Sequence, residues 1–289
     1  MAATAFLWSI AGLFIKVIDW NPIAIAGMRS LIASIVIIVY LRHPKIHLSW
    51  PQVLAAVANA GTMLLFVSAN KTTTAANAIL LQYFAPILTV FIGSAFLKER
   101  ARWEHFMALP LVAAGMIIMF SDELGEGKLL GNSIAILSAV TFSFYFVFMR
   151  MQKDGSPLES ILLSHWLTAG ICLIISIFLP LPQVTFKSLM AIAVLGIVQM
   201  GFSAVLFSVA IKRVSAIQAN LIAVIEPVFN PVWVFFALGE SPGVHTLIGG
   251  GIILLAVTSA SVISAHRREG AIHSESELQP EVCPRRLKK

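Results

Sequence analysis

The stretch FVSANKTTTAANAILLQYFAPILTVFIGSAFLKE (66–99) returns 141 residues later as FSVAIKRVSAIQANLIAVIEPVFNPVWVFFALGE (207–240). The two segments share nine identities over 34 positions without a gap. In the first copy these are Phe66, Ala69, Lys71, Ala75, Ala78, Leu80, Pro86, Leu97 and Glu99. Apolar segments share some residues through composition alone, but lysine, proline and glutamate at matching places indicate an internal duplication.

The composition of the whole chain is that of a membrane protein. Of its 289 residues, 58% are apolar and 12% are charged, with a mean hydropathy of +0.88. A soluble domain has about 45–50% apolar and about 25% charged residues. Charged side chains are costly at bilayer depth and are therefore confined to loops. The composition excludes an ordinary soluble enzyme and predicts an all-α integral membrane protein.

Ten apolar runs fit a membrane crossing of about 20 residues each. We predict transmembrane helices at 2–18, 22–41, 51–69, 75–97, 104–120, 131–150, 157–180, 186–210, 214–238 and 243–265. The duplication divides them into two five-helix repeats, 1–120 and 131–265. Because five is odd, the second repeat enters the membrane from the opposite side and is inverted. Inverted repeats are typical of secondary transporters that work by alternating access around a central cavity.

The distribution of Lys and Arg predicts that both termini are cytoplasmic. Fifteen of the 20 basic residues fall on the side of the termini and three on the other side, while Lys16 and Arg29 lie within spans. Such an excess marks the cytoplasmic face. Residues 266–289 carry six basic and four acidic residues without an apolar period, and we expect a disordered cytoplasmic tail there.

Several short motifs resemble the paired signatures of EamA-type members of the drug/metabolite transporter (DMT) superfamily. They are Leu97-Lys98-Glu99, Trp103 and Gly115 in the first half, and Glu226-Pro227-Val228, Leu238-Gly239-Glu240 and Leu247-Ile248-Gly249 in the second. The resemblance covers the whole chain apart from the tail. One departure is Ala256, where a glycine like Gly115 would be expected.

Within that superfamily the chain is most similar to bacterial aromatic amino-acid exporters of the YddG type. The resemblance implies a ten-helix basket in the inner membrane that exports aromatic and other neutral amino acids. The superfamily also contains carriers of other cargo. The alternatives are therefore a carrier for another small metabolite, a drug or a lipid, and a non-coupled facilitator or channel.

Polar and aromatic groups deep in the spans are the candidates for substrate binding, because an unsatisfied polar group costs about several kcal/mol in hydrocarbon. They are Trp8, Asn59, Gln82, Tyr83, Tyr145, Trp166, Gln199, Asn220 and Glu226. We expect a cavity formed by the third, fourth, eighth and ninth predicted spans, with contributions from the first, sixth and seventh. Aromatic rings there would stack on a flat or apolar side chain. Each ring taken singly favours packing or lipid contact, and only the set together favours an aromatic cargo.

Other residues in the spans carry more specific expectations. Pro86 and Pro227 remove a helical hydrogen bond at equivalent places and predict broken helices. Glu226, the one mid-membrane carboxylate, is expected to have a structural role, to contact a substrate amino group or to exchange protons. Arg29 fits either a substrate carboxylate or packing against backbone carbonyls. Gly115 and Gly249 predict close helix contact.

The motifs of the main rival class, intramembrane enzymes, are missing from the sequence. It has no His-Glu-x-x-His pair, no second mid-membrane carboxylate to face Glu226, no Gly-x-Ser-x-Gly turn and no Walker loop. We therefore expect no enzymatic activity, no metal, no organic cofactor and no nucleic-acid partner. The expected partners are a small-molecule substrate and the lipid bilayer. A monomer would suffice, and the sequence leaves the oligomeric state open.

Overall fold

The computed structural model describes residues 1–73, 75–99, 102–122, 128–180, 182–238 and 243–278. Throughout these ranges the chain is helical with short connections and has no strand. The helices are α1 (Ala2–Trp8), α2 (Ala11–Lys16), α3 (Pro22–Leu41), α4 (Trp50–Thr72), α5 (Ala75–Gln82), α6 (Ala85–Leu97), α7 (Trp103–Met119), α8 (Leu129–Met151), α9 (Pro157–Ser176), α10 (Phe186–Val194), the π-helix η1 (Leu195–Phe202), α11 (Ser203–Ala210), α12 (Ala216–Ala223), α13 (Ile225–Leu238) and α14 (Val244–Leu278).

Eight helical segments in the described part are long and apolar enough to cross a membrane. They are Pro22–Leu41, Trp50–Ala69, Asn77–Leu97, Leu129–Met151, Pro157–Ser176, Phe186–Ala210, Ala216–Ala237 and Val244–Ser264. Two shorter apolar helical stretches, Ala2–Ile15 and Trp103–Met119, lie where the sequence predicts the first and fifth crossings. All ten predicted runs are thus helical, and eight of them meet the length of a full span.

Three of the predicted spans are interrupted rather than continuous. The first is divided at Ser9 and Ile10, the fourth at Tyr83 and Phe84, and the ninth at Val224. The last two breaks lie 141 residues apart, which is the offset of the duplication. Each precedes a proline in the first turn of the next helix, Pro86 in α6 and Pro227 in α13. Proline is tolerated there because the first N–H groups of a helix lack intrahelical partners anyway.

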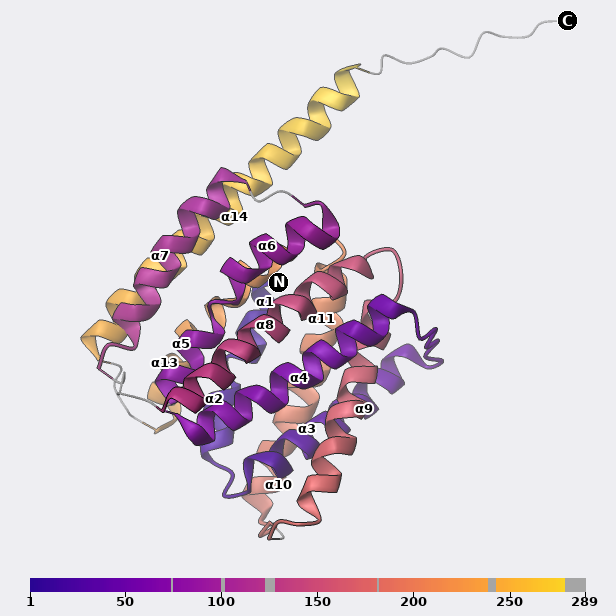
Figure 1. Cartoon of the computed structure of the whole chain (residues 1–289), viewed down its shortest axis with the longest axis vertical. Helices are drawn as coiled ribbons and strands as arrows, with labels where there is room; N and C mark the ends of the chain where they lie inside the picture. Colours follow the sequence, from indigo (N-terminus) through magenta and orange to yellow (C-terminus); the bar gives the residue numbers. More distant parts are fainter. Residues whose placement is uncertain (74, 100–101, 123–127, 181, 239–242, 279–289) are drawn as a thin grey trace, which may run out of the picture.

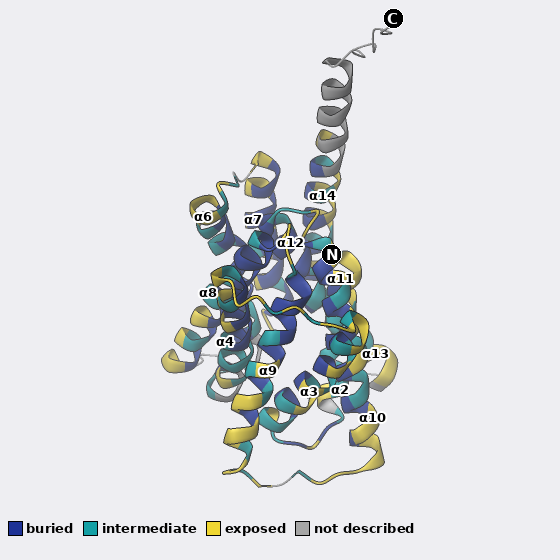
Figure 2. Ribbon diagram, turned by 90° about the vertical axis from the view of Figure 1, so that its right-hand side faces the viewer, coloured by how far each residue is buried: buried dark blue, intermediate teal, exposed yellow. Residues whose placement is uncertain are grey.

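The centre of the molecule is built around α8, which packs against α4, α5, α6 and α12. Its side chains Phe146 and Met149 are fully buried together with Leu162, Phe207 and Ile211 from neighbouring helices. Figure 2 shows buried residues between the helices and exposed ones on the outer surface. Many of the exposed residues are large and apolar, such as Phe178 at 83% and Leu255 at 73% exposure, which suits a surface facing lipid.

Helices α7 and α14 form a pair along one edge of the bundle (Figure 1). Their backbones touch at two glycines, as the sequence predicts. A Cβ atom built on Gly115 would lie 2.9 Å from the carbonyl oxygen of Gly249, and one built on Gly249 would strike the backbone of Gly115 and Met119. The close α7–α14 packing therefore depends on glycine at both positions.

Hydrogen bonds join four connections at one end of the bundle, which we call the basic end. Arg150 pairs with Glu99 at 2.9 Å and donates from Nη1 to the carbonyl oxygens of Ile211 and Lys212. Glu159 accepts a hydrogen bond from the backbone N–H of Lys45. The segments that carry most of the basic loop residues thus lie together.

The opposite end is marked by different contacts. Asp122 lies 2.9 Å from Nδ1 of His245, which joins the end of α7 to the start of α14. Thr73 donates to Asn132, and Trp20 donates to the carbonyl oxygen of Gln183. These two sets of contacts mark the two ends of the helical bundle.

The C-terminal helix differs from the expectation of a disordered tail from residue 266. Helix α14 continues to Leu278, about nine turns from its start at Val244. The sequence has no apolar period there, and the helix projects beyond the rest of the bundle (Figure 1). Residues 279–289 of the predicted tail lie outside the described residues.

Candidate functional site

A cavity of about 430 Å³ lies inside the bundle. Its walls come from α1, α2, α3, α4, α5, α8, α9, η1, α11 and α13. These include all seven predicted spans expected to form it, together with the second span, α3, which was not expected. Pockets for small ligands are usually about 300–1,000 Å³. The cavity is therefore large enough for a metabolite of modest size.

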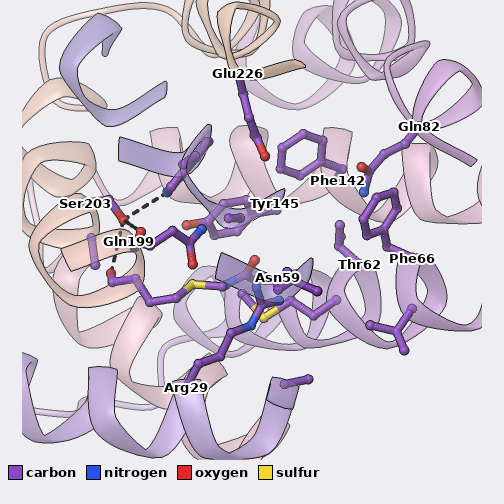
Figure 3. A pocket seen from close by; sticks show the side chains of 18 of the residues that line it. Arg29, Asn59, Thr62, Phe66, Gln82, Phe142, Tyr145, Gln199, Ser203 and Glu226 are labelled. Carbon is purple, nitrogen blue, oxygen red and sulfur yellow. Dashed lines mark hydrogen bonds between the residues drawn. The ribbon is translucent and has the colours of Figure 1, made fainter. Parts of the chain in front are cut away.

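Seven of the nine candidate substrate-binding residues line this cavity. They are Trp8, Asn59, Gln82, Tyr83, Tyr145, Gln199 and Glu226, joined by the helix-break residue Pro227. They come from helices far apart in the sequence, and Figure 3 shows Glu226, Gln82 and Gln199 entering from different sides.

Trp166 and Asn220 are not among the lining residues, and neither is Pro86. Trp166 is 41% exposed on the outer side of α9, while its neighbour His165 lines the cavity. Successive helical residues point about 100° apart, so the two cannot share a face. Asn220 is fully buried between α12 and α6, where it donates to Oγ1 of Thr89 at 2.7 Å. Pro86 is buried at the start of α6.

The carboxylate of Glu226 is held by a hydrogen bond from the other half of the chain. The hydroxyl of Tyr83 donates to Oε2 of Glu226 at 2.9 Å. Tyr83 lies at the break between α5 and α6, and Glu226 lies in the first turn of α13, just after the equivalent break. Unpaired N–H groups at a helix start favour a carboxylate there. One contact thus links the two broken helices inside the cavity.

Two of the cavity amides are fixed by serine hydroxyls. Asn59 donates from Nδ2 to Oγ of Ser164 at 2.8 Å, and Gln82 donates from Nε2 to Oγ of Ser138 at 3.0 Å. Gln199 is less constrained, because its Oε1 is buried without a hydrogen-bond partner among the described residues. Its backbone lies in the π-helix η1, a form that occurs most often as a local bulge at functional sites.

Aromatic rings form one wall of the cavity. Tyr145 stacks on Phe207 with ring centroids 5.5 Å apart and on Phe142 at 6.4 Å. Trp8 packs on Phe207 at 5.7 Å and donates from Nε1 to Oγ of Ser203. This wall offers flat apolar surface with a few polar edges.

The sequence carried unused signals for two of these rings. Phe142 precedes Tyr145 by three residues, so both lie on the same face of α8. Phe207 is the repeat equivalent of Phe66, and both line the cavity. The spacing thus relates Phe142 to the candidate Tyr145, and the duplication relates Phe207 to Phe66.

Arg29 of α3 also lines the cavity. Figure 3 shows its side chain entering opposite Glu226. Its Nε is buried without a hydrogen-bond partner among the described residues. The ion pairs found in the described part of the chain also leave Arg29 and Glu226 unpaired with each other. The cavity thus holds one guanidinium and one carboxylate on opposite walls.

The cavity extends away from the basic end. Its lining includes Pro22, the first residue of α3, and Val67 in the last two turns of α4, both toward the opposite end. Fully buried side chains such as Met149 and Ile211 lie toward the basic end and are not among the lining residues, and neither are Arg150 and Glu99.

Within the described ranges, His, Cys, Asp and Glu side chains nowhere gather in a group of three or more that would suit a metal ion. The single cavity carboxylate already accepts a hydrogen bond from Tyr83.

Comparison with known proteins agrees with this architecture. Residues 1–121 and 129–262 match the model of the EamA-like transporter family. An "uncharacterized transporter" of Archaeoglobus fulgidus is 32% identical over 208 residues, which cover 71% of this chain and 74% of that protein. The "uncharacterized transporter YoaV" of Bacillus subtilis is 19% identical over 277 residues, 88% of this chain and 93% of that protein. A solved structure described as "Crystal structure of protein" shares the fold, with a TM-score of 0.80 at 21% identity over 92% of this chain and 96% of that chain.

Proposed function

The chain belongs to the EamA-like transporter family of the DMT superfamily, and from this premise we propose that it exports aromatic and other neutral amino acids by alternating access. Its cargo site is the central cavity. The proposal places the protein in the inner membrane as ten transmembrane helices in two inverted repeats, with both termini in the cytoplasm.

The observation that carries the proposal is the composition of the cavity wall. Stacked rings of Tyr145, Phe142 and Phe207 offer apolar surface to a side chain. Glu226 supplies a carboxyl group inside the cavity. A substrate with an amino group and an apolar side chain satisfies both features. In this role Glu226 contacts the amino group while Tyr83 orients its carboxylate.

The proposed ten-helix architecture is supported by how the breaks and loops are arranged. The breaks after α5 and after α12 share the offset of the duplication. The family model matches the chain twice, in segments of similar length. The basic loops gather at one end, which the positive-inside rule assigns to the cytoplasm. A cavity that extends away from that end corresponds to an outward-facing state.

Alternating access then requires the basic end to open while the opposite end closes. The broken helices provide places where backbone angles change without losing a complete hydrogen-bond ladder. Asn220 and Pro86 serve this movement by packing α12, α6 and α7 rather than by touching cargo.

The test is uptake of radiolabelled amino acids into liposomes that contain the purified protein. Aromatic, branched and small amino acids are compared with and without an imposed pH gradient. We expect saturable uptake that other neutral amino acids inhibit by competition. Acceleration by the gradient would indicate proton coupling, and equal rates would indicate a facilitator. No uptake of any amino acid would refute the proposed cargo and leave another small metabolite, a drug or a lipid.

A further inference from the structure

The guanidinium of Arg29 is the one cavity group with a permanent positive charge among the described residues. A charge at bilayer depth is costly, so buried arginines are almost always paired or face a water-filled cavity that serves a substrate. Within the described part of the chain, no carboxylate lies within ion-pair distance of Arg29. Its Nε is buried and makes no hydrogen bond there.

The unused hydrogen-bonding capacity is not confined to Arg29. Nδ1 of His165 and Oε1 of Gln199 are also buried without partners among the described residues, and both side chains line the same cavity. Three helices, α3, α9 and η1, therefore each present a polar atom that no described group satisfies. Buried polar groups in native proteins are usually satisfied, so such a gathering indicates that a ligand completes it.

Close helix packing holds this part of the wall in place. A Cβ atom built on Gly196 would lie 2.5 Å from Cβ of Ile32 and 3.2 Å from the carbonyl oxygen of Arg29. The glycine therefore lets η1 lie directly against α3. Gln199, about one turn further along η1, enters the cavity (Figure 3).

We propose that Arg29 is an anion subsite that binds the carboxylate of the cargo. A guanidinium donates two parallel hydrogen bonds to a carboxylate, which suits it to planar recognition of that group. Glu226 lies on the opposite wall and is already held by Tyr83. The subsite selects molecules that carry a carboxylate over amines that lack one. The inference rests on the proposed function only in taking the cavity as the cargo site.

The test compares four ligands of one shape by thermal stabilisation of the purified full-length protein. Phenylalanine has both charges, phenethylamine lacks the carboxylate, 3-phenylpropionate lacks the amine and phenylalanine amide has a neutral carbonyl group. The variants are Arg29→Gln, which removes the charge, and Arg29→Lys, which keeps the charge without the planar fork. Arg42→Gln is the matched control, because Arg42 is exposed at the end of the same helix.

We expect the wild-type protein and Arg42→Gln to bind phenylalanine and 3-phenylpropionate more tightly than phenethylamine or the amide. Arg29→Gln should lower the affinity for both carboxylate ligands by about 10- to 100-fold. Its affinity for phenethylamine should stay within about twofold of the wild-type value. Arg29→Lys should retain the preference for carboxylates with a smaller loss of affinity. If Arg29→Gln does not fold, the affinities of Arg29→Lys for the same ligands test the subsite instead.

The opposite results would overturn the inference. Equal wild-type affinity for phenylalanine and phenethylamine, or a preference for carboxylates that survives in Arg29→Gln, would show that Arg29 has a packing role. The inference would also be overturned if the wild-type protein bound neither phenylalanine nor 3-phenylpropionate. Binding of 3-phenylpropionate that depends on Arg29, without amino-acid uptake in liposomes, would leave the anion subsite standing and refute the amino-acid exporter.

Discussion

The hydrogen bond from Tyr83 to Glu226 joins residues that come from opposite repeats of the chain. Each belongs to a broken helix, so each lies on backbone that a rocking motion would displace. A ligand amine competing for the same carboxylate would alter this contact. In the proposed mechanism, the binding of a cargo amine to Glu226 would therefore be felt by both broken helices.

Replacing Glu226 by Gln removes the negative charge and keeps the shape of the side chain. We expect Glu226→Gln to lower the rate of amino-acid uptake by about tenfold or more, since a charge-assisted hydrogen bond contributes about 1.5–3 kcal/mol. Liposome uptake at several pH values measures the effect. Glu159→Gln, at the basic end and outside the cavity, is the control. An unchanged rate and pH profile in Glu226→Gln would exclude any role for Glu226 in recognition or proton transfer.

Two tryptophans that the sequence treats alike are expected to behave differently. Trp8→Leu removes a ring that packs on Phe207 and donates to Ser203 in the cavity. We expect its apparent affinity for phenylalanine to fall about three- to tenfold. Trp166→Leu changes an exposed side chain on the outer side of α9. Its apparent affinity for phenylalanine should stay within about twofold of the wild-type value. Competition uptake measures both. Similar losses in both variants would contradict the placement of Trp166.

At the scale of elements, the glycines at the α7–α14 contact make a test of packing. Gly249→Val would drive a side chain into the backbone of Gly115 and Met119, and overpacking of this kind costs about 1–3 kcal/mol. We expect a lower midpoint of thermal unfolding in detergent. Gly251→Val is the matched control, because nothing lies within 4 Å of a Cβ atom built on Gly251. Equal midpoints of thermal unfolding for the two variants would show that the close α7–α14 contact does not contribute to the free energy of unfolding.

The positions of the elements follow from the sequence more directly than the faces they present. Helix α3 begins at Pro22, as predicted, and the side chain of Asn21 caps the backbone N–H of Ile23. Length and apolar content determine such segments. By contrast, the apolar residues of α9 are not concentrated on one face, so hydrophobicity alone does not distinguish the cavity position of His165 from the outer position of Trp166. The π-helix η1 and the break at Ser9 also have no local signal, because packing against neighbouring helices determines them.

At the scale of the whole molecule, the orientation of the chain is open to a direct test. We expect Lys187→Cys to react with a membrane-impermeant maleimide on intact cells, and Lys153→Cys to react only after the membrane is permeabilised. Both are made in a Cys172→Ser, Cys283→Ser background. Both lysines are exposed. Lys153 lies on the connection after α8, at the basic end, and Lys187 lies in the first turn of α10, at the opposite end. The reverse labelling pattern would place the termini outside, and labelling of both in intact cells would refute the inverted topology.

The position of Arg29 within α3 has a consequence for biosynthesis. An arginine near the centre of a helix opposes insertion by the translocon by about 2.5–3.5 kcal/mol, while each central Ile, Leu or Val favours it by about 0.3–0.6 kcal/mol. Helix α3 contains ten Ile, Leu and Val residues, and its mean hydropathy of 2.2 is among the highest in the chain. Its own residues therefore offset the cost of the arginine. The helix can enter the bilayer during translation before the later helices of the cavity have been made.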